Sequence, residues 1–345
     1  TGDVSVDTAG QRPAVKANLK LTGLDLNKYL AGLEAAPAKA AAPRETGATG
    51  ATLPKTVNKA PQVRGYTQRG GWSQEPYDLS ALGLVDVDAR LSLGRLLYKQ
   101  IKVGQSQIAV GLKNRVLKTD FTDVQLYSGR GKGMVAIDAS NPTLPKVATN
   151  LNVSGIEALP LLKDAADLDW LSGKGNLALG VTGQGKTQHA LMNALGGSAD
   201  LKINDGAIVG INIPGMLRNI GQGKLGGLSS APSEKTDFSE MSSSWAINSG
   251  VARNTDLKLS GPLIRVTGEG AVKLGERTID YLLKPKIVAD TRGQGGEIDI
   301  GGLEVPLKVH GPWEKPKFTP DVKGLLKDPN KVLDSVKEIG KQFKG

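Results

Sequence analysis

Apolar and polar residues alternate along much of this chain, and the alternation restricts its fold more than any other sequence feature. Val15, Ala17, Leu19 and Leu21 are separated by single polar residues. The same pattern recurs at residues 147–153, 177–181, 257–259, 264–274 and 307–309. A period of two places apolar side chains on one face of a strand, whereas strands buried on both faces read as continuous apolar runs. The sequence therefore predicts a mainly β fold of antiparallel strands with one apolar face.

The composition indicates which kind of core such strands can bury. Of the 345 residues, 39% are hydrophobic, only 4% are aromatic and 45 are glycine. Globular domains usually contain about 45–50% apolar residues when glycine is counted. The length suits two ordinary domains or one large β domain. We expect a core of Leu, Val, Ile and Ala, which argues against a compact enzyme lined with aromatic side chains.

Several classes of chemistry are excluded by residues that the chain lacks. It has no cysteine and only two histidines, His189 and His310. Thiol nucleophiles, iron–sulfur clusters and cysteine-ligated zinc are therefore excluded. The net charge of +10 is spread along the chain, and the aromatic side chains that stack on bases in nucleic-acid grooves are scarce. We predict no catalytic residue, no metal site, no cofactor and no nucleic-acid partner.

An internal repeat and two composition shifts suggest the domain organisation. Residues 13–26 align with residues 145–158, and in both copies a strand ends at a glycine before a short helical stretch. We predict N-terminal strands of the sheet at 1–33, a flexible linker rich in Ala, Pro and Gly at 34–71, a β domain at 72–320 with a loop at 221–235, and a C-terminal helix at 321–345.

The expected C-terminal helix is amphipathic. Asp328 is a good N-cap, Pro329 suits the first helical position, and apolar residues then follow at helical spacing. Such a helix either caps the open end of a sheet or docks on a membrane surface or a partner. In the second case, the residues expected to meet anionic head groups are Lys331, Lys337 and Lys341.

Two glycine motifs raise the alternative of a nucleotide-binding enzyme. Residues 180–187, GVTGQGKT, match the P-loop pattern, in which Lys186 would reach the phosphates. The strand before it alternates, however, and no series of buried parallel strands follows. Residues 221–226, GQGKLG, match a dinucleotide-binding pattern but lack the preceding strand that this pattern needs. A P-loop enzyme is therefore the weaker alternative.

No segment has the length of a membrane span. The longest apolar window, at 208–217, covers about ten residues, whereas a spanning helix needs about 20. The chain begins at Thr1 and runs at once into strand-like sequence. We therefore expect a fragment or a matured product, whose upstream part could hold an anchor.

The C-terminal half resembles a known family, the AsmA family. The residues that carry the resemblance are ADLKINDGAIVGINI at 199–213, TDFS at 236–239, INSGVARN at 247–254, the run at 257–283 and the closing GLEVPLKVHGPWEKPKFTPD. It covers roughly residues 70 to 325. Relatives in this family include the TamB and YhdP proteins. The resemblance implies an elongated, curved and open β-sheet groove, held in the bacterial periplasm by an N-terminal anchor in the inner membrane.

The resemblance also implies a role in lipid transfer or outer-membrane biogenesis without enzymatic activity. The partners would be a phospholipid or another membrane lipid, and the membrane surface. The alternation supplies the candidate wall of the lipid groove: Leu19, Leu21, Leu151, Val153, Leu177, Leu179, Val181, Leu201, Ile203, Leu257, Leu259, Val266, Val272, Leu274, Leu307 and Val309. The same alternation also builds sandwiches whose apolar faces pack together. A periplasmic scaffold or assembly factor for outer-membrane proteins, with a closed β core, therefore stays open.

Overall fold

A computed structural model describes residues 1–30, 71–221, 233–288 and 304–321. The expected linker at 34–71, apart from its last residue, lies outside the described residues. So do most of the expected loop at 221–235, the second glycine motif after its first residue, and the expected C-terminal helix with Lys331, Lys337 and Lys341.

The described residues form one sheet of 17 strands. In chain order the strands are β1 (Gly2–Asp7), β2 (Ala14–Leu21), β3 (Leu24–Asp25), β4 (Asp86–Leu93), β5 (Leu96–Tyr98), β6 (Ile101–Lys113), β7 (Val116–Leu126), β8 (Gly129–Asp138), β9 (Lys146–Glu157), β10 (Leu171–Gln184), β11 (Gly196–Val209), β12 (Lys235–Asn248), β13 (Val251–Ser260), β14 (Ile264–Lys273), β15 (Thr278–Ile287), β16 (Leu307–Pro312) and β17 (Lys317–Pro320). Short helices interrupt them: α1 (Asn27–Leu30), the 3-10 helix η1 (Ser80–Gly83), α2 (Ala158–Ala166), α3 (Gln188–Asn193) and α4 (Ile213–Gly221).

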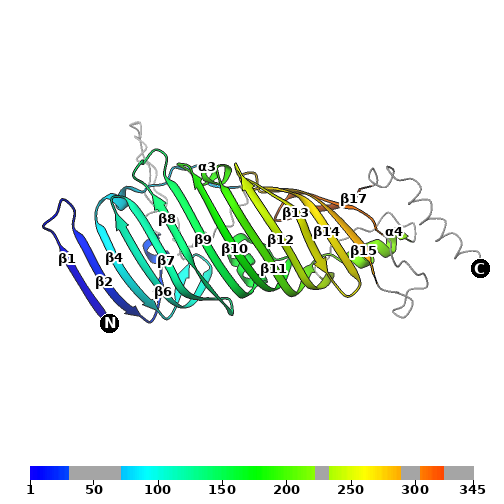
Figure 1. Cartoon of the computed structure of the whole chain (residues 1–345), viewed down its shortest axis with the longest axis horizontal. Coiled ribbons are helices and arrows are strands. Elements are labelled where there is room, and N and C mark those ends of the chain that lie inside the picture. The colour runs from blue at the N-terminus through cyan, green and yellow to red at the C-terminus, as the bar shows by residue number, and fades with distance from the viewer. Residues whose placement is uncertain (31–70, 222–232, 289–303, 322–345) are drawn as a thin grey trace, which may run out of the picture.

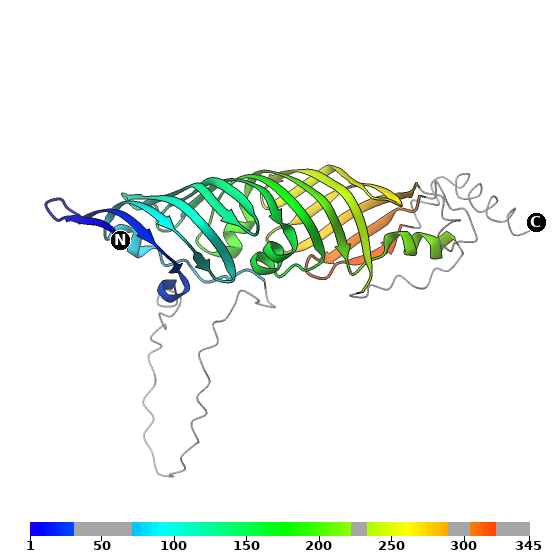
Figure 2. The ribbon, with the colours of Figure 1, turned by 90° about the horizontal axis from the view of Figure 1, so that it is seen from below.

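The sheet is open, curved and mixed, and it does not close into a barrel (Figures 1 and 2). From β6 onward each strand pairs antiparallel with the next one in the chain, as alternation predicts. Two pairs are parallel, β2 with β4 and β3 with β5. The predicted mainly β, curved and open sheet is confirmed, with these parallel pairs as the one departure from a purely antiparallel order.

The strand register aligns apolar residues from strand to strand on one face of the sheet, here called the inner face. Paired residues of adjacent strands point to the same side. Following the pairs across nine strands gives a continuous line, the central row: Leu19, Leu91, Ile108, Phe121, Gly133, Leu151, Leu179, Ala199 and Trp245. A parallel row runs beside it: Leu21, Leu93, Ser106, Val124, Gly131, Val153, Leu177, Leu201 and Ser243.

The outer face of the same strands is polar. On β9, for example, Asn150 and Asn152 are exposed between the half-buried Leu151 and Val153. Lys202 on β11 pairs with Glu240 on β12 at 2.9 Å on the exposed side. The sheet therefore has one apolar face and one face in contact with water, as many antiparallel sheets do.

At the C-terminal end the inner face is covered by a helix and becomes a packed core, the C-terminal cluster. Its fully buried members include Ile213 and Leu217 of α4, which pack with Leu307 of β16 and Ile264 of β14. Ala158 of α2 joins the same cluster. In Figure 2, α4 lies at the C-terminal end of the curved sheet.

A smaller cluster lies on the inner face toward the N-terminus, here called the N-terminal cluster. Leu93, Leu96 and Ile108 are its buried members, and Leu91 and Phe121 pack against it. The short pair β3–β5 supplies part of it, because Leu24 and Leu96 are register partners. The inner face thus has two packed clusters, and β1 extends beyond the N-terminal one with all of its residues exposed.

Candidate functional site

The inner face brings most of the predicted groove residues together. Register pairs join Val153 with Leu177, Leu177 with Leu201, and Leu151 with Leu179. Farther along, Leu259 pairs with Val266. Strand alternation and this register place the following residues on the same face: Leu19, Leu21, Val181, Ile203, Leu257, Val272, Leu307 and Val309. Leu274 falls one residue after β14, where its carbonyl accepts a hydrogen bond from Trp72 Nε1 at 2.6 Å.

These residues differ in how much surface they offer to a ligand. Five belong to the C-terminal cluster and are almost fully buried: Ile203 at 1%, Leu259 at 3%, Val266 at 2%, Leu307 at 0% and Val309 at 4% exposed. They serve the protein core. The others, including Leu151 and Leu179, are half-buried and keep part of their surface accessible.

An accessible part of the inner face lies between the two clusters, on β8, β9 and β10. Leu19 of β2 and Val272 of β14 are also half-buried outside the clusters, and Val4 and Val6 of β1 are exposed. We call the part on β8 to β10 the open section and define it by six half-buried side chains: Val135, Leu151, Val153, Leu177, Leu179 and Val181. These residues belong to neither packed cluster. The open section is the candidate site because it offers apolar surface that the described residues do not bury.

Sequence reasoning missed the contribution of β8 to this section. In β8 the inward positions begin with three glycines, Gly129, Gly131 and Gly133, before Val135 and Ile137. The glycines hide the alternation, although their spacing of two continues it. At Gly133 an added Cβ would lie 2.8 Å from a Leu151 methyl group. The absence of side chains here makes room for the leucines of the neighbouring strand.

An aromatic and polar wall borders the open section on the side of the C-terminal cluster. Trp245 of β12 ends the central row, and its ring centroid lies 5.9 Å from that of Tyr281 on β15. The Tyr281 hydroxyl donates a hydrogen bond to Asn254 Oδ1, and Asn254 Nδ2 donates to the Ser244 carbonyl at 2.8 Å. Burial raises the pKa of Tyr281, with the nearby Asp256 carboxylate adding to the effect. The hydroxyl is therefore protonated at neutral pH.

The P-loop pattern does not form a phosphate-binding loop. Gly180 lies inside β10, where it pairs with Asn150 of β9 and Ser198 of β11. The Gly185 amide donates to the Pro145 carbonyl at 3.0 Å, and Thr187 caps the six-residue α3 by accepting from Ala190 N–H at 3.0 Å. Because strand pairing already uses the amides around Gly180, they cannot surround a phosphate.

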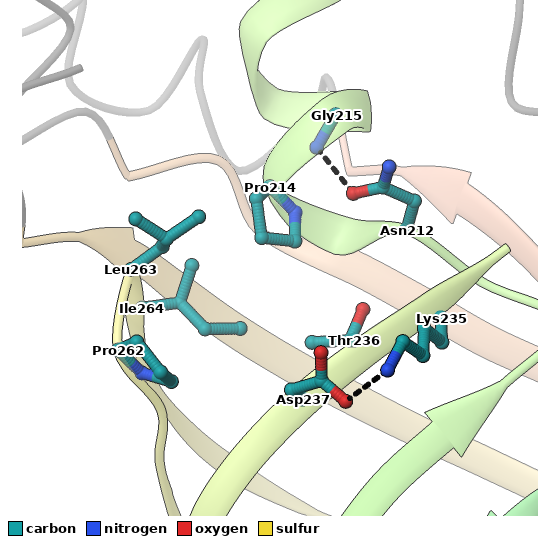
Figure 3. A pocket seen from close by; sticks show the side chains of 9 residues that line it. All are labelled: Asn212, Pro214, Gly215, Lys235, Thr236, Asp237, Pro262, Leu263 and Ile264. Atoms are coloured by element: carbon teal, nitrogen blue, oxygen red, sulfur yellow. Dashed lines mark hydrogen bonds and ion pairs between the residues drawn. The ribbon is translucent and has the colours of Figure 1, made fainter. Parts of the chain in front are cut away.

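A pocket of about 350 Å³ lies where α4 begins (Figure 3). Pro214 faces Leu263 and Ile264 across it. Its charged side chains, Lys235 and Asp237, pair with each other at 3.1 Å. The pocket sits at the packed end of the sheet and its lining charges are neutralised, so the open section is the stronger candidate site.

The described residues contain no group of three or more His, Asp or Glu side chains that could hold a metal ion. In the described part of the chain, every helix is too short or too polar to span a bilayer.

The scaffold alternative predicts a closed β core. The described residues form an open sheet instead.

Comparisons with known proteins place the chain in a family. A family model described as AsmA family matches residues 3–257. Protein AsmA of Escherichia coli (strain K12) is 23% identical over 227 residues, which cover 64% of this chain and 37% of that protein. The chain therefore spans little more than a third of the length of this curated relative. No solved structure matches the chain.

Proposed function

Since the chain belongs to the AsmA family, we propose that it shields the acyl chains of a membrane lipid on the open section of its inner face. Family membership supports a general role in the envelope. The observation that carries the finer proposal is the central row: apolar side chains line up across the sheet, and Leu151 of β9 and Leu179 of β10 stay partly accessible.

The energetics favour hydrocarbon on such a surface. Each CH₂ group moved from water into an apolar environment gains about 0.8 kcal/mol. Leu151, Leu177 and Leu179 offer aliphatic surface without the unpaired polar groups that would oppose this transfer. Aliphatic walls also lack the fixed polar partners that would hold a guest in one place. A lipid tail is therefore expected to bind by burial alone and to slide along the row.

The proposal includes a setting and a mode of action. We place the domain in the bacterial periplasm, with phospholipid as its cargo and the membrane surface as its partner. The protein acts as a lipid carrier or conduit without chemical turnover. Its excess of positive charge, +10 overall, supports contact with anionic head groups.

Lipid extraction of the purified protein, followed by mass spectrometry, tests the proposal. We expect phospholipid to co-purify with the unmutated chain. Leu179→Asp should reduce the bound lipid, because a charge on the inner face opposes hydrocarbon. The matched control is Asn150→Asp, which places the same charge on the exposed outer face of the neighbouring strand β9. Absence of lipid from the unmutated protein, or equal lipid in both variants, would refute the proposal.

A further inference from the structure

We propose that Trp245, at the end of the central row, is the stop against which the methyl end of an acyl chain bound on the open section rests. This inference rests on the proposed function and adds a specificity: the protein discriminates lipids by acyl length. Three features of the inner face support it. The central row ends at Trp245, the space between the two clusters has the length of an acyl chain, and the polar atoms around Trp245 are hydrogen-bonded to one another.

The first feature is that the row changes from accessible to packed at Trp245. Leu151 and Leu179 precede it along the central row, and both are half-buried outside the clusters. Ala199, between Leu179 and Trp245, is small and leaves the indole as the next large group. Beyond Trp245 lies Tyr281, which is only 5% exposed. A chain lying along the row therefore meets the indole and finds packed core behind it.

The second feature is length. The opposite end of the open section is Phe121 of β7, which packs against the N-terminal cluster. From β7 to β12 the row crosses five strand spacings, or about 24 Å. One leaflet of a bilayer is about 15 Å of hydrocarbon thick, half of the full core. The two aromatic side chains thus enclose space for one acyl chain of ordinary membrane length.

The third feature is that the polar atoms of the wall bond to one another. Trp245 Nε1 donates to Ser243 Oγ at 2.9 Å, and Asn254 Nδ2 also donates to Asp256 Oδ1 at 2.6 Å. Asn254 Oδ1 accepts from the Tyr281 hydroxyl and from Leu257 N–H. With these groups engaged, the wall offers ring surface to the guest. Ring surface suits a terminal methyl group and gives a charged head group nothing to bind.

Fluorescence quenching with brominated phospholipids locates the chain end. The full chain is loaded with phosphatidylglycerol that carries bromine either near the methyl end or near the glycerol. We expect quenching of tryptophan emission by the first lipid to exceed that by the second. Trp245→Phe should remove the difference, because the chain's other tryptophans, Trp72, Trp170 and Trp313, do not lie on the central row.

Competition among phosphatidylglycerols of graded acyl length tests the stop itself. We expect the unmutated protein to bind chains up to a limiting length and to lose affinity beyond it. Trp245→Ala should raise that limit by a few carbons. Trp170→Ala is the matched control, since Trp170 packs against the same C-terminal cluster and is absent from the row.

The outcomes separate the two proposals. The role of Trp245 as a stop is refuted if lipid binds with the same limiting acyl length with and without Trp245. It is also refuted if bromine near the glycerol quenches as strongly as bromine at the methyl end. In both cases the proposal of lipid shielding stands. If no phospholipid binds the unmutated protein at all, the proposed function fails first. Should Trp245→Ala fail to fold, the quenching difference in the unmutated protein still decides the matter.

Discussion

At the scale of single residues, a few side chains join parts of the sheet that are distant in sequence. The Arg277 guanidinium lies over the ring of Trp72 at 5.3 Å and over the ring of Trp313 at 5.5 Å, and it pairs with Glu314. The two indoles meet edge to face, with centroids 6.0 Å apart. This cluster fastens the segment that precedes β4 to the turn between β14 and β15 and to the turn between β16 and β17.

Arg277→Ala should lower the free energy of unfolding by about 1–3 kcal/mol, because it removes two cation–π contacts and leaves the Glu314 carboxylate without this partner. Urea unfolding followed by circular dichroism measures the change. The control is Arg253→Ala, since Arg253 is exposed on the outer face and its removal should change stability by less than about 0.5 kcal/mol. Equal effects in the two variants would contradict the role assigned to Arg277.

A second residue-scale prediction concerns Tyr127, in the turn between β7 and β8. Burial and the hydrogen bond that its hydroxyl donates to Asp164 at 2.7 Å raise the pKa of Tyr127 to about 12. An unfolded tyrosine ionises near pH 10. The folded state therefore holds this proton more tightly, so the stabilisation is fully present below about pH 10 and is lost as the pH rises through about 12.

The pKa of Tyr127 can be measured by nuclear magnetic resonance of ring-labelled tyrosine, with Tyr127→Phe to assign the signal. Asp164→Asn should move that pKa part of the way back, because burial continues to act after the carboxylate is gone. A folded-state pKa of Tyr127 near 10 would show that the hydroxyl does not make this contact.

At the scale of elements, alternation predicts where the strands lie, but it does not predict every pair of adjacent strands in the sheet. Residues 13–21 and 145–153 each form a strand followed by a short helix, as the repeat indicates. From β6 onward the antiparallel pairs follow chain order, whether a short turn or a connection with a helix joins the two strands. The parallel pair of β2 with β4 does not, since a parallel pair needs a long crossover and the chain between them carries no periodic signal.

Helix α4 illustrates the same limit. Pro214 suits the first turn of a helix, but nothing in the local sequence indicates that α4 packs against the inner face. Leu217 is fully buried in the C-terminal cluster. Local periodicity does not indicate which side chains far apart in the sequence pack together. It therefore cannot predict which inner-face residues belong to the core and which to the open section.

Leu217→Ala should therefore destabilise the protein by about 2–5 kcal/mol, as expected for a cavity left in a packed core. Chemical unfolding monitored by tryptophan fluorescence provides the measurement. Leu84, which is 70% exposed, supplies the control, and Leu84→Ala should change stability by less than about 0.5 kcal/mol. A small effect of Leu217→Ala would mean that α4 does not close this end of the sheet.

At the scale of the whole molecule, the fold is a curved open sheet (Figure 2) in which an accessible section on β8 to β10 lies between two packed clusters. Alternation predicts which residues share one face of the sheet, but it does not separate those that form the core from those that stay accessible. In the structure Ile203, Leu259 and Val266 belong to the core, whereas Leu151 and Leu179 remain available. This distinction arises from α4 and from the register of distant strands, and it turns a general apolar face into a bounded site.

Photo-crosslinking from the inner face tests the central claim most directly. A photoreactive amino acid is placed at Leu151 in the open section, or at Asn150, its exposed neighbour on the other face of β9. Both proteins are irradiated with phospholipid vesicles, and bound lipid is detected by mass spectrometry. The account predicts a lipid adduct at position 151 and little or none at position 150. Adducts of equal yield at the two positions, or none at position 151, would contradict it.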